Sequence, residues 1–156
     1  MILAIDPGPE DSAYLMFDGY KIHGFGKIPS GELLNSIILT PGYPTDLAVE
    51  GIASYGMAVG KEVFDTCIWI GRYWQASQAK NKRLVYRMEV KDHLCHDRRA
   101  KDANIRQALI DRFGGPQEIK KGGKLYGISK DVWSALAVAC TYYDLYSGVN
   151  NASTVL

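Results

Sequence analysis

Short apolar segments separated by turn-forming residues fill the first third of the chain. The segments at 3–6, 13–17 and 21–28 have the length of strands, and the turns between them contain Asp-Pro-Gly and Asp-Gly. Both sequences favour tight reversals, so the pattern predicts three strands joined as an antiparallel meander. A short helix beginning near Ser30 and a fourth strand over 46–52 are predicted to follow.

Segments with helical spacing dominate the rest of the chain. They predict helices over 62–79, 103–113 and 129–146, and a fifth strand is predicted over 84–88. A meander followed by alternating helices and strands is typical of an α/β protein. The pattern therefore predicts a mixed five-stranded sheet, with its first three strands antiparallel and helices on its faces.

Length and composition limit the class of protein. A chain of 156 residues suits one domain, which we expect to span 1–149, followed by a flexible tail over 150–156. The 47% of hydrophobic and 22% of charged residues are ordinary for a soluble globular protein. No run approaches the roughly 18 apolar residues of a membrane span, and the apolar opening is too short for a signal peptide. Three scattered cysteines favour a reduced, cytoplasmic protein.

Charge is unevenly distributed, although the formal net charge is only +1. Residues 80–130 contain 14 Lys or Arg and 6 Asp or Glu, whereas the rest of the chain contains 4 and 11. A basic segment in an otherwise acidic chain can present a positive surface to a polyanion such as nucleic acid. A solvated basic face without a partner explains the same distribution, so charge alone leaves both explanations open.

Three acidic residues stand next to apolar segments that are expected to be buried. Asp6 ends the first strand, Glu50 lies in or at the end of the fourth, and Asp131 lies in the first turn of the last helix. Each has an ordinary explanation by itself: a turn residue, an edge-strand acid and a partner of the helix dipole. Together they indicate a metal site, because converging carboxylates repel one another unless a divalent cation such as Mg²⁺ binds between them.

The residues around these acids resemble those of a known family. The segments AIDPG, LAVEG and DVWSALAVA are similar, in sequence and in order, to the RuvC-type Holliday-junction resolvases of the RNase H-like superfamily. The basic segment VKDHLCHDRRAKDANIRQALIDRFGG adds to the resemblance, which covers nearly the whole chain in element order. The resemblance implies an RNase H-like fold, and the small size suggests a phage or prophage member.

The resemblance implies an endonuclease that nicks four-way or branched DNA junctions by two-metal hydrolysis of the phosphodiester. Asp6, Glu50 and Asp131 match the metal ligands of the family, with Mg²⁺ as the expected metal and Mn²⁺ as a substitute. Lys91 and Lys101 match the two basic residues near the cut phosphate, where a lysine supplies a point charge.

One position departs from the family pattern. Resolvases of this type generally have a further Asp three residues after the position of Asp131, and this chain has Ser134 there. Serine is a poor metal ligand, so one metal site is expected to be weaker, or activity to be impaired. Two other functions therefore stay open: a nuclease for RNA–DNA hybrids or flaps, and a catalytically weak protein that binds branched DNA. A sugar-kinase or actin-like ATPase fits less well, because that fold normally needs two such domains.

The other predicted DNA contacts come from the basic segment and from a glycine-rich loop. The loop over 51–60 carries Tyr55 and Met57, and similar resolvases place an apolar or aromatic side chain there at the junction centre. Ordinary loop packing explains these two side chains as well. The basic residues expected to contact DNA, together with Lys91 and Lys101, are Arg83, Arg87, Arg98 and Arg99.

The predicted helix over 62–79 carries apolar side chains around most of its circumference. One face has to cover the sheet, and the remainder favours a partner. In the resolvase family the equivalent helix forms a homodimer, so the resemblance implies a two-fold symmetric dimer with two active sites.

Overall fold

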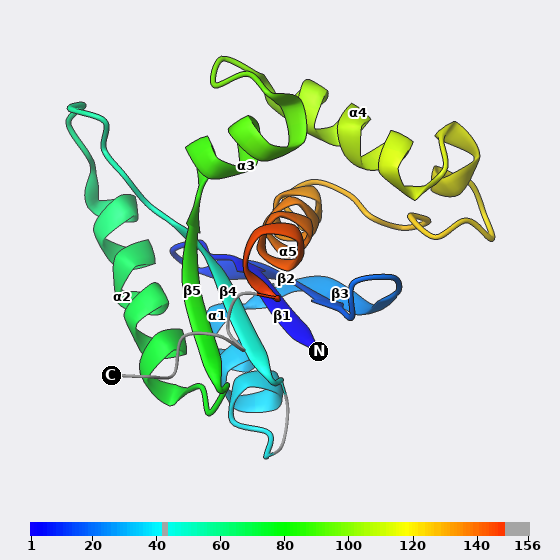
Figure 1. Cartoon of the computed structure of the whole chain (residues 1–156). Helices are drawn as coiled ribbons and strands as arrows, with labels where there is room; N and C mark the ends of the chain where they lie inside the picture. Colours follow the sequence, from blue (N-terminus) through cyan, green and yellow to red (C-terminus); the bar gives the residue numbers. More distant parts are fainter. Residues whose placement is uncertain (42–43, 149–156) are drawn as a thin grey trace.

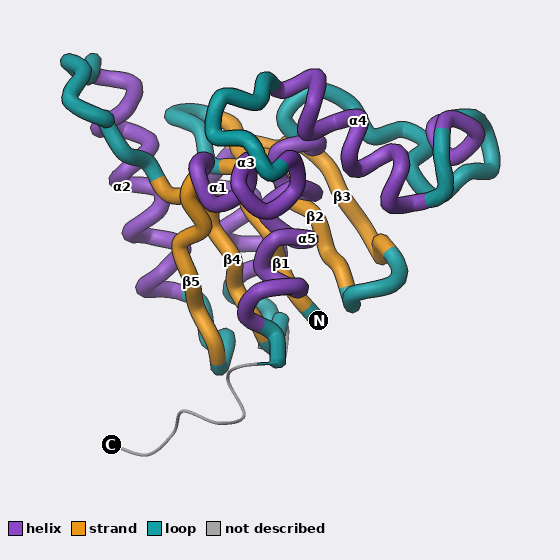
Figure 2. The backbone as a smooth tube through the Cα atoms, turned by 45° about the horizontal axis from the view of Figure 1, so that its top comes forward, coloured by secondary structure: helices purple, strands orange, loops and turns teal. Residues whose placement is uncertain are grey.

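The computed structural model describes residues 1–41 and 44–148 of the chain. They form a five-stranded sheet in the order β3-β2-β1-β4-β5, with helices on both faces (Figures 1 and 2). β1, β2 and β3 are antiparallel neighbours, whereas β4 runs parallel to β1 and β5 runs parallel to β4. The mixed sheet predicted from the sequence is therefore confirmed. The strands are β1 (Ile2–Asp6), β2 (Asp11–Phe17), β3 (Ile22–Pro29), β4 (Asp46–Gly51) and β5 (Asn81–Tyr86).

The helices form a layer on each face of the sheet. α5 lies against one face, and α3 and α4 contact α5 from outside, while α1, η1 and α2 lie on the other face (Figure 1). The helices are α1 (Ser30–Leu33), the π-helical turn η1 (Leu34–Ile38), α2 (Lys61–Ala76), α3 (Arg87–Cys95), α4 (Asp102–Phe113), the 3-10 turn η2 (Pro116–Ile119) and α5 (Val132–Tyr146).

The side chains of β1 are divided between two hydrophobic cores. Ile2 and Ala4 belong to the core under α5, whereas Leu3 and Ile5 belong to the core under α1 and α2. Because successive side chains of a strand point to opposite faces, Asp6 projects on the α5 side with Ile2 and Ala4. The alternating direction of the side chains along β1 thus decides on which face of the sheet its terminal acid lies.

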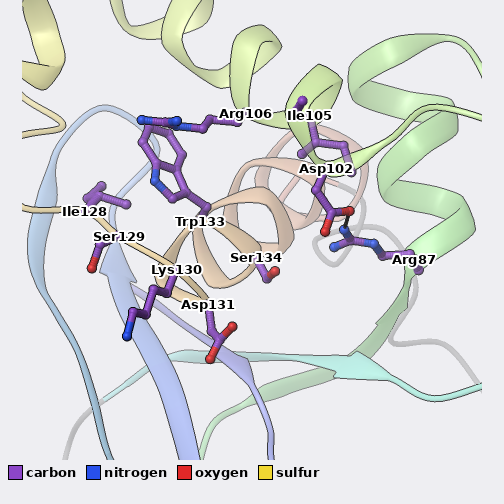
Figure 3. Close-up of a pocket in the computed structure, with 11 residues that line it drawn as sticks. Arg87, Asp102, Ile105, Arg106, Ile128, Ser129, Lys130, Asp131, Trp133 and Ser134 are labelled. Carbon is purple, nitrogen blue, oxygen red and sulfur yellow. Dashed lines mark hydrogen bonds and ion pairs between the residues drawn. The ribbon is translucent and has the colours of Figure 1, made fainter.

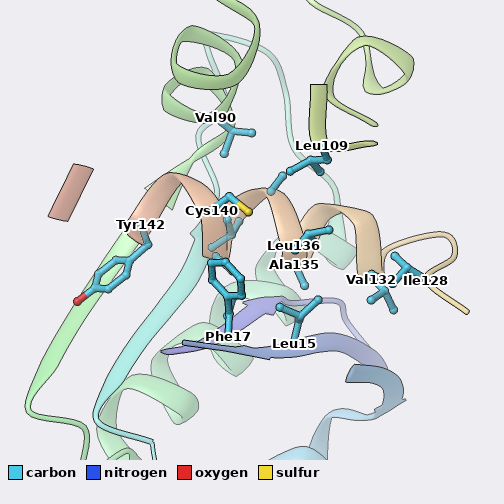
Figure 4. Close-up of a cluster of buried hydrophobic side chains, with 14 of the residues drawn as sticks. Leu15, Phe17, Val90, Leu109, Ile128, Val132, Ala135, Leu136, Cys140 and Tyr142 are labelled. Atoms are coloured by element: carbon cyan, nitrogen blue, oxygen red, sulfur yellow. The ribbon is translucent and has the colours of Figure 1, made fainter. Parts of the chain in front are cut away.

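α5 is buried along most of its length, as expected for a helix that is apolar on nearly all sides. Figure 4 shows Leu136 and Cys140 of α5 above Leu15 and Phe17 of β2. This packing fixes the position of the residues that precede the helix.

Several element boundaries differ from the predicted ones, and α5 begins at Val132 instead of 129. α2 ends at Ala76 instead of 79, because Ser77 has extended backbone angles. β5 begins at 81 and ends at 86, instead of spanning 84–88. α3 follows it directly and was not predicted, because Val90 is its only fully buried residue and the amphipathic pattern is weak.

Within residues 1–41 and 44–148, no helix is both long and apolar enough to cross a membrane. The predicted tail over 150–156 lies outside the described residues.

Candidate functional site

A row of neighbouring strand positions brings acidic and basic side chains together on the α5 face of the sheet. Asp6 is paired with Ala13 of β2, and Ala13 is paired with Lys27 of β3. On the other side, β1 and β4 are paired in parallel up to the residue before each acid, so Glu50 is the neighbour of Asp6. Directly opposed residues project on the same face, and Ala13 belongs to the core under α5. Lys27, Asp6 and Glu50 therefore all project toward α5.

The sharp turn after Asp6 is held in place by Gly8 and Ser12. A Cβ atom on Gly8 would lie 2.3 Å from a backbone carbonyl oxygen of the same turn, so glycine is required there. The Gly8 N–H donates to Ser12 Oγ at 3.3 Å, and Ser12 Oγ lies 2.8 Å from both Ser30 Oγ and the Tyr73 hydroxyl. All three hydroxyl-bearing side chains are buried. This network ties the turn, and with it the end of β1, to α1 and α2.

Asp131 is the residue immediately before α5, rather than part of its first turn as the sequence predicted. Its Oδ2 accepts a hydrogen bond from Lys27 Nζ at 2.6 Å, and this contact raises the pKa of the Lys27 ammonium group. The negative charge of Asp131 also raises the pKa of Asp6. α5 thus brings a third acid to the row, with its carboxylate engaged by a lysine of the same chain.

Arg87, the first residue of α3, lies on the other side of the acids. Its Nη1 is 3.6 Å from Glu50 Oε1, and its guanidinium group forms a second ion pair with Asp102 at the start of α4. Lys27 and Arg87 therefore each neutralise one of the three converging acids.

Burial and the neighbouring Glu50 carboxylate raise the pKa of Asp6 to about 8. A hydrogen bond between the two carboxyl groups and the charge of Asp131 act in the same direction, whereas Arg87 lowers the pKa of Asp6. A hydrogen bond between two carboxyl groups requires that one of them is protonated. Near neutral pH the metal-free pair therefore keeps a proton.

The donor atoms at this end of the sheet are carboxylate oxygens, the hard ligands that Mg²⁺ and Mn²⁺ prefer. Among the described residues, no three Asp, Glu, His or Cys side chains are already arranged around a common metal position. For these acids to surround a metal, the proton shared between Asp6 and Glu50 has to be lost, and the ion pair between Asp131 and Lys27 has to open. The donor chemistry fits a hard divalent cation, at a site whose third ligand has to be released first.

Two hollows meet at Asp131, and they differ in charge. The basic hollow has a volume of about 500 Å³, and Arg87, Arg106 and Lys130 line it together with Asp102 (Figure 3). The acidic hollow has a volume of about 690 Å³ and is lined by six acids and two lysines. Its acidic residues are Asp6, Glu10, Asp11, Glu62, Asp65 and Asp131.

Neither predicted catalytic lysine is among the described residues that line these two hollows. Lys91 lies in the middle of α3 and is half-buried. Lys101 is exposed and occupies the N-cap position of α4. Arg87 is thus the residue of the basic segment that the fold brings against Glu50, and the roles of the two lysines stay predictions.

The other predicted DNA-binding arginines lie outside the site. Arg83 pairs with Glu89 at 3.3 Å, and Arg98 pairs with Asp92 at 2.8 Å. Arg99 is exposed. Two of these three guanidinium groups therefore already have a carboxylate partner within the chain.

Tyr55 and Met57 lie in the connection between β4 and α2, which begins directly after the strand that carries Glu50. Both side chains are exposed, by 58% and 72%. Ordinary packing of this loop therefore does not account for them, and their contact with DNA stays a prediction.

Ser134 occupies the position where the resolvase pattern has another acid. It lines the basic hollow with Asp131 and Asp102. The Asp102 side chain is 86% exposed and already paired with Arg87. The described structure therefore offers no buried acid in place of the missing one at this position.

Sequence reasoning missed Lys27 at the site, although a signal was present. Lys27 is two residues from Phe25, which packs against the core under α5, so strand alternation places both on that face. Arg106, Lys130 and Trp133 were also missed. They meet only because the N-terminal ends of α4 and α5 come together, and no local pattern reports such a contact.

Searches of protein-family models and of curated proteins give no match. Solved structures that resemble this chain include Thermus thermophilus RuvC, and T. thermophilus RuvC in complex with a Holliday junction substrate. Each matches with a TM-score of 0.68 and 16% sequence identity, over 92% of this chain and 94% or 93% of the other. The chain therefore has a RuvC-like fold, as the sequence predicted.

Proposed function

We propose that this chain is a divalent-metal-dependent endonuclease that nicks four-way or other branched DNA junctions. The observation that carries the proposal is the convergence of Asp6, Glu50 and Asp131 at one end of the sheet. The RuvC-like fold supports it, because T. thermophilus RuvC has been solved with a Holliday junction substrate.

The three acids hold the metal in this proposal, with Asp131 joining the other two once its ion pair within the chain opens. Two bound Mg²⁺ ions roughly 4 Å apart would activate a water molecule and stabilise the leaving oxygen. Lys91 and Lys101 are the residues we propose for the phosphate next to the cut. Arg87 partly neutralises Glu50 while the metal is absent, so it lowers the repulsion between Glu50 and the neighbouring acids.

The proposal includes a homodimer formed through α2 and acting in the cytoplasm. Two-fold symmetry would present two sets of acids to two strands of one junction. Tyr55 and Met57 would enter the junction centre from the exposed loop after β4, where an aromatic side chain can stack on an opened base.

Cleavage of a synthetic four-way junction tests the proposed activity. With Mg²⁺, we expect nicks in opposing strands of the junction and none in a linear duplex of the same sequence. Asp6→Asn removes one metal ligand, so it should bind the junction and leave it uncut. Clean cutting of an RNA–DNA hybrid, with the junction intact, would contradict the proposal and favour the hybrid nuclease.

A junction-binding protein without nuclease activity is the second candidate. The observation that favours it is that Lys27 and Arg87 already neutralise two of the three acids, while Ser134 replaces the further acid of the family pattern. The same assay separates the two candidates. Binding without nicking in either Mg²⁺ or Mn²⁺ would support the second.

A further inference from the structure

The basic hollow has a feature that the proposed cleavage chemistry does not use. Trp133 and Arg106 form one of its walls, with the Arg106 Cζ atom 5.0 Å from the centre of the indole ring. Figure 3 shows the indole extending from α5 toward Arg106, while Arg87 and Asp102 lie on the other side of Ser134. A volume of about 500 Å³ is within the range of pockets that hold a small planar ligand.

The Trp133–Arg106 wall combines a fixed ring with an available cation. Trp133 is half-buried and packs against the core under α5, whereas Arg106 is exposed. Within the described part of the chain, no ion pair engages Arg106 or Lys130, unlike Arg83, Arg87, Arg98 and Arg112. A guanidinium plane supported by an indole ring is a surface on which a nucleobase can stack.

Charge determines on which side of the acids a DNA strand can lie. In the acidic hollow, six acids face only Lys27 and Lys61, and Lys61 is itself paired with Asp65. A phosphate backbone is repelled there. The basic hollow presents Arg87, Arg106 and Lys130, and it shares Asp131 with the acidic hollow, so a strand in it passes directly beside Asp131.

We infer, on the basis of the function proposed above, that the basic hollow holds an unpaired nucleobase of the DNA strand being cut. The base stacks on the Trp133–Arg106 pair, and Lys130 binds the phosphate of the same nucleotide. A base is available for this only where pairing is already interrupted, as at a branch point. The hollow therefore favours branched over linear DNA and positions the cut strand beside Asp131.

Four-way junctions carrying 2-aminopurine at successive positions around the branch point test this nucleotide site. In the absence of Mg²⁺, we expect wild-type protein to change the fluorescence at one position next to the branch. Trp133→Ala should abolish that change and weaken junction binding about fivefold or more at constant salt. Trp133→Phe keeps a ring and should restore both. Arg106→Ala should weaken binding in the same way.

Lys21→Ala is the control, because Lys21 is an exposed cation in the turn between β2 and β3, at the opposite end of the sheet from Asp6, and does not line the hollow. We expect its junction affinity and its 2-aminopurine signal to match those of wild type. Thermal melting identifies a variant that fails to fold, and if Trp133→Ala does, the comparison of Arg106→Ala with Lys21→Ala decides the question. If wild type does not bind junctions, the proposed function and the nucleotide site both fail. If it binds and neither Trp133→Ala nor Arg106→Ala alters affinity or fluorescence, the nucleotide site alone is excluded.

Discussion

Asp6 is the residue at which we expect pH to act on both the stability of the fold and the proposed metal binding. Its pKa is raised from 3.8 to about 8 in the folded chain. Between these values the folded chain keeps a proton that the unfolded chain has lost, so the free energy of unfolding falls as pH rises. If Asp6 binds a metal as proposed, we expect metal affinity to rise over the same pH range, because the metal competes with that proton.

Asp6→Asn should remove most of this pH dependence. Without metal, we expect the variant to match wild type near pH 4 and to be more stable by about 5 kcal/mol at pH 8. Urea unfolding between these pH values measures the difference. Asp131→Asn is the control, because that side chain is half exposed and paired with Lys27, so it should keep most of the wild-type slope. A wild-type slope in Asp6→Asn would contradict a raised pKa.

In the function proposed above, Lys27 would compete with the metal for Asp131. Lys27→Met removes the ammonium group and keeps the apolar stem, so we expect Mg²⁺ affinity to rise about two- to fivefold, as the loss of an exposed ion pair allows. Isothermal titration calorimetry at constant pH measures this. Lys61→Met removes the same charge from the acidic hollow but breaks a pair with Asp65, so its affinity should change less. If both variants raise Mg²⁺ affinity equally, the effect comes from the lost positive charge alone, and direct competition between Lys27 and the metal for Asp131 is contradicted.

The sequence predicted the acids of the site better than their partners. Asp6 ends β1 and Glu50 is the next-to-last residue of β4, and both strands are recognisable in the sequence as short apolar segments, so the approach of these two acids could be predicted. Lys27 and Asp131 are 104 residues apart, and their contact depends on how α5 crosses the sheet. The pairing of Arg87 with Glu50 depends likewise on the turn from β5 into α3, which the sequence did not reveal.

α5 is the element that links the core to the site. Its middle is buried against the sheet, and Asp131 immediately precedes it. Leu136→Ala, at a side chain with 0% exposure, should lower the free energy of unfolding by about 2–5 kcal/mol. Leu145→Ala makes the same change in the same helix at a side chain that is 37% exposed, and should cost about 1 kcal/mol or less. Chemical denaturation compares the two, and equal losses would contradict the packing of α5.

Elements with strong periodicity were predicted, and those stabilised by backbone pairing or weak burial were not. The start of β5 was missed because Asn81, Lys82 and Arg83 are polar, yet their backbones pair with Asp46, Leu47 and Ala48 of β4. Such hydrogen bonds do not depend on apolar side chains, so the pattern does not report them. α3 was missed for a related reason, since a helix that fully buries one residue has little amphipathic pattern.

At the scale of the whole molecule, one stripe of α2 is apolar and uncovered. Phe64, Cys67, Ile68 and Gly71 have the spacing of a single helix face, and all four are exposed. Phe64 and Ile68 are large side chains that are 59% and 54% exposed. The opposite face of α2 contributes Tyr73 to the core. The stripe is therefore not needed for the fold of one subunit, which favours its use between two.

Ile68→Glu should convert the dimer we propose into a monomer, because it places a charge at the centre of an apolar stripe that the dimer would bury. Sedimentation velocity measures the change, and circular dichroism should show an unchanged fold. Leu39→Glu is the control, since it places the same charge at a residue 48% exposed outside α2. If Ile68→Glu stays dimeric, the interface lies elsewhere. Each subunit carries its own three acids, so a monomeric variant should still nick single strands while losing the paired nicks that two-fold symmetry provides.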